Sequence, residues 1–168
     1  MTVLLTAEQI QKRVRELGIE IAADHPGGTL YLIGILKGAF LFLADLARAI
    51  PRPVRVDFVG TSSYGSRKTS SGEVRLTKDL DVTIEDAHVV IVEDIVDTGV
   101  TLGYLIQLFE QRKPRSIRVA TLLDKADRRI RPVRLDYVGF PIPDRFVVGY
   151  GLDFNEEYRS LPDIRVLD

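Results

Sequence analysis

The residues best suited to chemistry follow one apolar segment, Val89–Val92. Two adjacent carboxylates, Glu93 and Asp94, come directly after it, and a turn at residues 97–101 follows them. The turn offers backbone N–H groups at the start of a helix, two hydroxyls, and a glycine that permits close approach. These groups together can hold a phosphate monoester. The predicted phosphate-binding residues are Asp97, Thr98, Gly99, Val100 and Thr101.

Acidic residues beside a phosphate site repel the phosphate unless they bind something else. Sugar hydroxyls and a divalent cation are the natural partners for Glu93 and Asp94. Because consecutive strand residues point to opposite faces, the strand has to end or bend before both can serve one ligand. The alternative is an ordinary strand–turn–helix with Asp97 as N-cap. The combination of a buried strand, two carboxylates, hydroxyls and a glycine favours a functional site.

The run from Val92 to Thr101 resembles the signature with which type I phosphoribosyltransferases bind 5-phosphoribosyl 1-diphosphate (PRPP), in the form typical of 6-oxopurine enzymes. The resemblance extends from about Tyr31 to Pro162. It implies an α/β fold with an open, mainly parallel, twisted sheet flanked by helices, a small hood and a mobile lid loop. Val100 departs from some relatives, which have lysine there, and this change could weaken binding of the 5′-phosphate.

The loop Leu36-Lys37-Gly38 interrupts an apolar segment between a predicted strand and a predicted helix. A lysine at a helix N-terminus opposes the helix dipole, so it contributes little to stability there, although it could also extend its charged end to solvent. By resemblance, Lys37 and Gly38 bind pyrophosphate together with Arg159, and the Leu36–Lys37 peptide bond is often cis.

The resemblance also assigns a purine-binding site. Lys125 follows the strand segment Val119–Leu123 and would donate to the 6-oxo group of the base, which a 6-amino purine lacks. Phe146 would stack on the base, although core packing is the commoner role of a strand phenylalanine. Backbone groups of Val147 would hydrogen-bond the edge of the base. Asp153 would lie near the 2-position of the base. The predicted cofactor is Mg²⁺, and its predicted ligands are Glu93, Asp94 and Asp153.

Residues 61–77 are polar and indicate a loop or a long hairpin. They contain Ser63-Tyr64, which matches the dipeptide of the family's mobile lid. A lid has a clear purpose, because water would hydrolyse PRPP in an open site.

The other elements follow from periodicity and capping. Thr6 and Gln9 have the spacing of a capping box at a helix N-terminus, and Pro26-Gly27-Gly28 ends that helix. Strands are expected over 29–36, 54–58, 88–93, 117–123, 137–139 and 146–148, and further helices over 39–50 and from about residue 102 to 109. In residues 54–58 valine and phenylalanine alternate with Arg55 and Asp57, which predicts a half-buried strand. Continuous aliphatic strands alternating with amphipathic helices predict a parallel sheet covered on both faces.

Composition limits the alternatives. The chain has 168 residues, 45% hydrophobic and 28% charged, and we expect residues 1–168 to form one domain. It contains no cysteine, which excludes disulfides, thiolate metal sites and thiol nucleophiles. The apolar N-terminal segment of a secretory signal is absent, and the apolar stretch 30–44 carries Lys37 at its centre, so we expect a cytoplasmic protein without membrane association.

Charge is unevenly distributed, although the net charge is −1. Seven acidic residues lie between Asp79 and Asp97, whereas nine Lys or Arg and two Asp lie between Arg112 and Arg134. Solvated surface is the simplest interpretation of both segments. The basic segment is the one feature that favours a PRPP-sensing regulator that binds nucleic acid, and the near-neutral net charge argues against it.

By resemblance, the predicted reaction joins hypoxanthine or guanine to PRPP and releases pyrophosphate, with no nucleic acid as partner. Asp97 is the predicted catalytic residue, whose carboxylate would accept a proton at N7 of the base or stabilise the N7-protonated form. A transferase for xanthine or another oxo base is a second possibility within the same class. By resemblance, the protein is a homodimer or a homotetramer.

Overall fold

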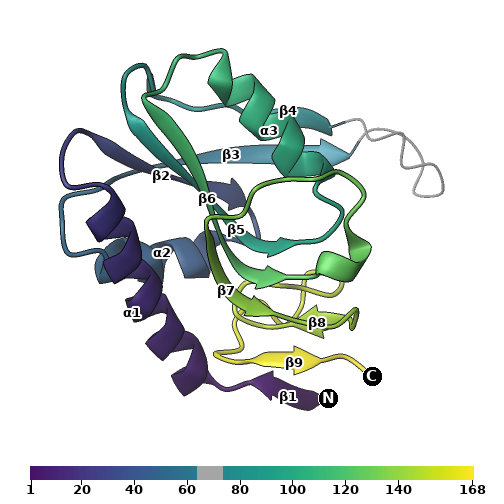
Figure 1. Ribbon diagram of the computed structural model, residues 1–168. Coiled ribbons are helices and arrows are strands. Elements are labelled where there is room, and N and C mark those ends of the chain that lie inside the picture. The colour runs from purple at the N-terminus through teal and green to yellow at the C-terminus, as the bar shows by residue number, and fades with distance from the viewer. Residues whose placement is uncertain (64–73) are drawn as a thin grey trace.

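The computed structural model describes residues 1–63 and 74–168, so Tyr64 of the predicted lid lies outside the described residues (Figure 1). Its helices are α1 (Ala7–Asp24), α2 (Phe40–Ala49), α3 (Val100–Glu110) and a short 3-10 helix at Ala126–Arg128. Its strands are β1 (Thr2–Leu5), β2 (Leu30–Leu36), β3 (Arg55–Ser63), β4 (Val74–Lys78), β5 (His88–Val96), β6 (Ser116–Asp124), β7 (Tyr137–Pro141), β8 (Val147–Val148) and β9 (Ile164–Val166). None of the helices in the described ranges is long and apolar enough to cross a membrane.

The main sheet has six strands in the order β4-β3-β2-β5-β6-β7, and all neighbours are parallel except β3 and β4. A second, antiparallel sheet, β1-β9-β8, lies beside the β7 end and brings the two termini together (Figure 1). The predicted open, mainly parallel sheet with a small hood is confirmed, and the hood is this second sheet.

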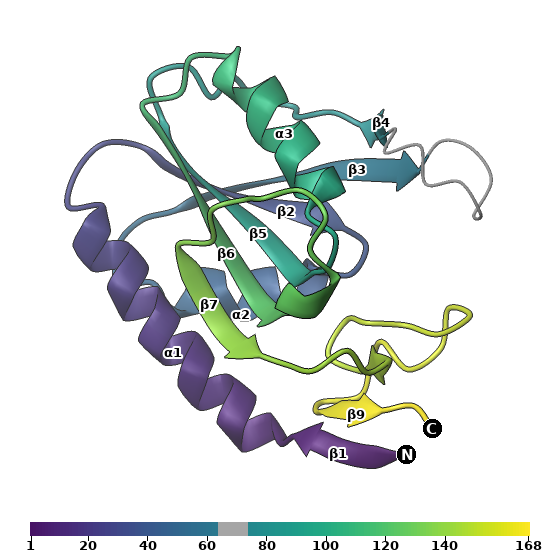
Figure 2. The same cartoon turned by 45° about the vertical axis from the view of Figure 1, so that its right-hand side comes forward.

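The two faces of the main sheet are covered by different helices, α1 and α2 on one face and α3 on the other (Figure 2). Strand residues alternate between the two cores: Leu30 and Leu32 of β2 pack with α1 and α2, whereas Tyr31 and Ile33 pack with α3. This alternation explains why central strands read as uninterrupted apolar runs, since both of their faces are buried.

The N-terminus of α1 has the predicted capping box. The Thr6 hydroxyl accepts from the Gln9 backbone N–H at 3.1 Å, and the Gln9 side chain accepts from the Thr6 N–H at 2.8 Å. These bonds satisfy two backbone donors that the first helical turn leaves unpaired.

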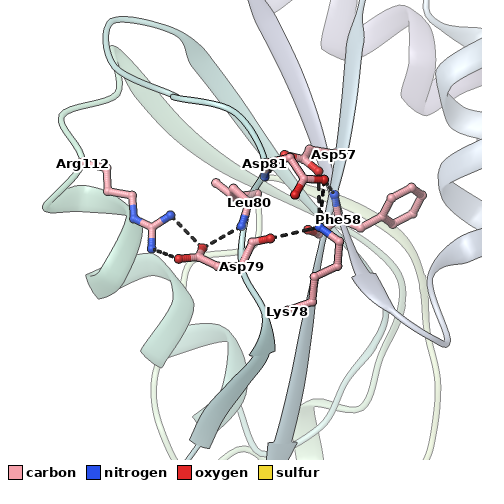
Figure 3. Close-up of polar contacts among 7 residues, drawn as sticks. All are labelled: Asp57, Phe58, Lys78, Asp79, Leu80, Asp81 and Arg112. Carbon is pink, nitrogen blue, oxygen red and sulfur yellow. Dashed lines mark hydrogen bonds and ion pairs between the residues drawn. The ribbon is translucent and has the colours of Figure 1, made fainter.

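The predicted burial pattern of β3 is wrong at two positions: Asp57 is buried, whereas the Val56 side chain is exposed, with 43% of its surface accessible. The Asp57 carboxylate accepts from the backbone N–H of Phe58 at 2.8 Å and of Asp81 at 2.9 Å, and it lies 3.8 Å from Lys78 Nζ (Figure 3). A buried carboxylate with these partners is satisfied, so it can occupy a position that the alternation assigns to solvent.

The acidic and basic segments of the chain pair with each other. Asp79 binds Arg112 through two hydrogen bonds of 2.8 Å, which tie the end of the β3–β4 hairpin to the end of α3 (Figure 3). These bonds are the main cause that lowers the pKa of Asp79. Asp86 pairs with Arg115 at 2.8 Å in the same way. Together with the contact between Asp97 and Arg128, three ion pairs join the two segments, and other basic residues of the second segment pair with acids elsewhere, as Arg118 does with Asp24.

We predict that Gly18→Ala destabilises the protein, although alanine is normally the better helix former by about 1 kcal/mol. A Cβ on Gly18 would lie 2.9 Å from the Cβ of Ala49 and closer still to its carbonyl oxygen, where α1 meets the end of α2. Separating the helices should cost about 1–3 kcal/mol of unfolding free energy, measurable by urea denaturation. Gly27→Ala is the matched control, because nothing lies within 4 Å of its added Cβ. Equal stability of the two variants would contradict the prediction.

Candidate active site

A cavity of about 420 Å³ lies beyond the carboxyl ends of β2 and β5, facing the hood. The chain reverses its winding between these two strands, since α2 and α3 cover opposite faces, and such a switch point is where open α/β sheets bind ligands. Ten of the predicted site residues line the cavity: Gly38, Glu93, Asp94, Asp97, Thr101, Lys125, Phe146, Val147, Asp153 and Arg159.

The predicted phosphate loop, residues 97–101, borders a second hollow of about 100 Å³, whose walls include Asp97, Thr98 and Gly99. Gly99 has a φ of 85°, and a side chain there would collide with the carbonyl oxygen of Arg131. The Thr98 carbonyl accepts from two backbone N–H groups of the segment 130–131, each at 2.9 Å. The N-cap of α3 is Gly99 rather than Asp97, so the carboxylate of Asp97 is not used as a helix cap.

Two predicted site residues, Val100 and Lys37, line neither the cavity nor the second hollow. Val100 begins α3, and its backbone N–H donates to the Thr98 hydroxyl at 3.3 Å. The Lys37 side chain extends to solvent with 67% of its surface exposed. Ser63 is the last residue of β3, and its predicted neighbour in the lid is not described.

Glu93 and Asp94 both line the cavity, although β5 continues to Val96. The strand therefore does not have to end before both residues can border one ligand site. Burial raises the pKa of Glu93 well above its usual value, and the neighbouring Asp94 carboxylate raises it further. Burial also raises the pKa of Asp94, while hydrogen bonds and Arg159 partly oppose that rise. Two desolvated carboxylates side by side are an arrangement that a cation or hydroxyl donors would stabilise.

The loop after β2 lies directly against this pair. The Leu36–Lys37 peptide bond is cis, as the resemblance implies. A side chain at Gly38 would collide with the Asp94 carboxylate, and one at Gly151 would collide with the Gly38 carbonyl. Glycine at both positions therefore allows two backbone segments to approach the carboxylates closely.

Sequence analysis missed two charged residues that contact the predicted ones. Arg128 Nε lies 3.2 Å from the Asp97 carboxylate, and Arg128 also lies 3.8 Å from Asp144. Asp144 is in turn 3.8 Å from Lys125 Nζ, whose side chain is only 10% exposed. Asp97 and Lys125 are thus linked through Arg128 and Asp144. In the sequence, the signal that could have pointed to Arg128 and Asp144 is their position close to Lys125 and Phe146.

The aromatic wall of the cavity comes from Phe146, which is 53% exposed, so the alternative of core packing is wrong. Its ring meets that of Phe154 edge to face, with 5.7 Å between the ring centres. Val147, the next residue, is buried in β8. A flat apolar surface next to backbone groups of a short strand suits a planar heterocycle.

Arg159, which also lines the cavity, holds the loop that carries Asp153. Its Nη1 donates to the Gly151 carbonyl at 2.6 Å, and its Nη2 lies 3.4 Å from the Asp153 carboxylate and 3.5 Å from that of Glu156. Glu156 is a third charged residue that sequence analysis missed.

Comparison with known proteins identifies the family. Residues 2–155 match the family model described as "Phosphoribosyl transferase domain". A hypoxanthine-guanine phosphoribosyltransferase from Bacillus subtilis (strain 168) is 50% identical over 165 residues, which cover 98% of this chain and 92% of that protein. The chain belongs to the hypoxanthine-guanine phosphoribosyltransferase family.

Solved structures agree with this assignment and with its fold. A hypoxanthine phosphoribosyltransferase from Staphylococcus aureus has a TM-score of 0.97 and 46% identity, and the match covers 100% of this chain and 91% of that one. A hypoxanthine phosphoribosyl transferase from Trypanosoma cruzi, studied for the role of its C-terminal region in oligomeric state and activity, has a TM-score of 0.95 and 46% identity, with the same coverage. The type I phosphoribosyltransferase fold predicted from the sequence is confirmed.

We predict that Glu93→Gln stabilises the ligand-free protein at about pH 8. The raised pKa means that ionising Glu93 costs more in the folded than in the unfolded chain, so this carboxyl's contribution to stability is lost as the pH rises through the folded-state pKa. A neutral amide avoids this loss, and we expect a melting temperature higher by roughly 2–6 °C in the absence of metal.

The gain should shrink as the pH falls from the raised folded-state pKa of Glu93 toward its ordinary pKa, and it should vanish below that, because the carboxyl is then neutral in both the folded and the unfolded chain. Glu85→Gln makes the same change at an exposed site and should leave the melting temperature unchanged. A Glu93→Gln protein no more stable than wild type at high pH would show that the carboxylate is not desolvated.

Proposed function

We propose that the protein is a purine-salvage enzyme that transfers the 5-phosphoribosyl group from PRPP to hypoxanthine or guanine, giving IMP or GMP and pyrophosphate. One observation carries the proposal: a single cavity joins the phosphate loop, the paired carboxylates, a nearly buried lysine and an exposed aromatic ring. Each of these groups suits one part of the two substrates.

The phosphate loop would hold the 5′-phosphate of PRPP. Thr98 and Thr101 supply hydroxyls, and Gly99, at the start of α3, permits close approach of the phosphate to backbone N–H groups. Because the cradle is built mainly from backbone, the change to Val100 leaves its donors in place. Residues 130–131 fix the loop through the Thr98 carbonyl, so it is organised before the ligand arrives.

Glu93 and Asp94 would hold the ribose hydroxyls and Mg²⁺. In the described parts of the chain no group of three or more Asp, Glu, His or Cys side chains is arranged as a metal cage. The pair of carboxylates at Glu93 and Asp94 fits Mg²⁺, which typically binds through one or two carboxylates, waters and substrate phosphates. Asp153, which lines the same cavity, would be a further ligand. When bound with PRPP, Mg²⁺ would neutralise charge on the departing pyrophosphate.

The base would lie between Phe146 and the phosphate loop. Phe146 would stack on the purine ring, and the backbone of Val147 would hydrogen-bond its edge. Lys125 would donate to the 6-oxo group from a site with little access to solvent, where a donor discriminates strongly against a base that offers another donor.

Asp97 would act on the base during transfer. Purine N9 forms a bond to C1 of the ribose as the bond from C1 to the pyrophosphate oxygen breaks, through a transition state with oxocarbenium character. The carboxylate of Asp97, beside N7, would accept a proton or stabilise the N7-protonated base. Arg128 would attract this carboxylate through charge rather than through a hydrogen bond, since its Nε lies 3.2 Å from Asp97 Oδ1 and that oxygen has no hydrogen-bond partner.

The charge pairing argues against the regulator alternative. Seven of the nine basic side chains in residues 112–134 form ion pairs with acidic residues. Such pairs reduce the positive field that nonspecific binding to nucleic acid requires. Xanthine transfer remains open as an activity of the same site, because one Lys125 contact suits any 6-oxo base.

We further propose a cytoplasmic homodimer or homotetramer. Family membership and the oligomerisation studied in the Trypanosoma cruzi relative support the assembly. The two states differ twofold in mass, so sedimentation velocity separates them.

We predict turnover of hypoxanthine or guanine, and none of adenine, in a spectrophotometric assay with PRPP and magnesium. Xanthine in the same panel tests the second activity. Failure with all four bases, combined with thermal protection by PRPP, would mean that the phosphate cradle is real and the enzyme assignment wrong.

We predict that Asp97→Asn lowers kcat by about 100-fold or more and leaves PRPP binding nearly unchanged, because the amide keeps the shape but cannot accept the proton. Steady-state kinetics and calorimetric titration with PRPP measure the two effects. Asp127→Asn, at an exposed residue of the adjoining segment, is the matched control. An unchanged kcat in Asp97→Asn would reject the acid–base role.

A further inference from the structure

We propose that Glu156 is an internal counter-anion of the pyrophosphate site: its carboxylate occupies the cations that bind pyrophosphate and lowers the affinity of the site for that ligand. This inference rests on the proposed function, which assigns Lys37 and Arg159 to pyrophosphate. It adds a residue that controls how tightly substrate and product diphosphates are held.

The Glu156 carboxylate bridges two cations that come from distant parts of the chain. Oε2 lies 3.2 Å from Lys37 Nζ, in the loop after β2, and Oε1 lies 3.5 Å from Arg159 Nη2. Each oxygen faces a different cation, as two oxygens of a phosphate group would. Glu156 thus makes in the free protein the contacts that the proposed function gives to pyrophosphate.

The backbone fixes the position of Glu156. Its N–H donates to the Asp153 carboxylate at 2.9 Å, and Phe154 and Glu157 exchange two backbone hydrogen bonds of 3.1 and 3.0 Å around it. Asn155 and Glu156 have positive φ values of 51° and 65°, which non-glycine residues adopt in tight turns. The contacts with Lys37 and Arg159 therefore arise from a defined turn.

The bridged cations lie at the edge of the catalytic cavity. Arg159 and Asp153 line that cavity, and so does Gly38, the residue next to Lys37. A diphosphate that reaches Lys37 and Arg159 has to displace the Glu156 carboxylate or remain close to it. Both cases weaken binding, the first through lost ion pairs and the second through repulsion between like charges.

The ion pair with Lys37 contributes little to folding. The side chains of Lys37 and Glu156 are 67% and 66% exposed, and pairs this exposed rarely stabilise a fold measurably. The contacts of Glu156 affect ligand affinity instead, because a polyanionic ligand competes with Glu156 for the Lys37 ammonium and the Arg159 guanidinium. Weaker binding also speeds departure of the product pyrophosphate.

Isothermal titration with inorganic pyrophosphate, with and without magnesium, tests the proposal on the full chain. We expect Glu156→Gln to bind pyrophosphate about three- to tenfold more tightly than wild type, and to show a similarly lower inhibition constant for pyrophosphate in the transferase assay. The gain should fall as salt screens the exposed charges. Glu157→Gln is the matched control, since it removes the same charge from the next, exposed residue.

A double-mutant cycle with Lys37→Met separates competition from a general change of charge. If Glu156 competes for Lys37, the tightening caused by Glu156→Gln should be smaller in the Lys37→Met background. An undiminished gain would contradict the bridging role.

The remaining outcomes are also informative. Equal affinity in wild type, Glu156→Gln and Glu157→Gln overturns the inference and leaves the proposed function intact. Weaker binding by Glu156→Gln also overturns it, because Glu156 would then hold the cations in place for the ligand. A wild-type chain that binds no pyrophosphate, with or without magnesium, contradicts the assignment of the site itself and with it the proposed function.

Discussion

The site depends on the parallel pairing of β2 with β5 at the centre of the sheet. This ladder runs from Leu30 opposite His88 to Gly34 opposite Val92, so both strands deliver their carboxyl ends to the same edge. The chain leaves β2 toward α2 on one face and leaves β5 toward α3 on the other. The two connections diverge, and the space between them is the cavity. A shift of one residue in this ladder would reverse which side chains face each core and would separate the loop at Gly38 from Asp94.

The buried acidic group in β3 has partners within the protein, whereas the two at the site lack enough of them. Asp57 is buried with backbone donors and a nearby lysine, and it ties β3 to the segment after β4. Glu93 and Asp94 are placed side by side, and desolvation raises the pKa of each. The first arrangement satisfies its carboxylate within the fold. The second leaves the desolvation cost of two carboxylates uncompensated until a ligand binds. Strain of this kind is expected where a protein binds a cation.

The sequence predicts the elements whose signals are local. The capping box at Thr6, the apolar runs of β2, β5 and β6 and the turn before α3 all depend on neighbours within a few residues, and the structure contains each of them. The strands β1 and β9 of the hood were not predicted, because each is at most four residues long and is defined by its pairing with the other end of the chain. Asp57 was assigned to solvent because its partner Asp81 is 24 residues away. Arg128, Asp144 and Glu156 were missed for the same reason, since only tertiary contacts reveal what a common charged residue does.

Ligand binding at this site is therefore an exchange of partners rather than a simple addition of contacts. Each cation assigned to a substrate already faces an acid of the protein: Lys125 faces Asp144, and Lys37 and Arg159 face Glu156. Asp97 likewise faces Arg128. The free energy that a polyanionic ligand gains from these cations is reduced by the ion pairs it displaces. An enzyme that must release pyrophosphate and a nucleotide after every turnover benefits from such a reduction, because contacts that hold the substrate too firmly also retain the products.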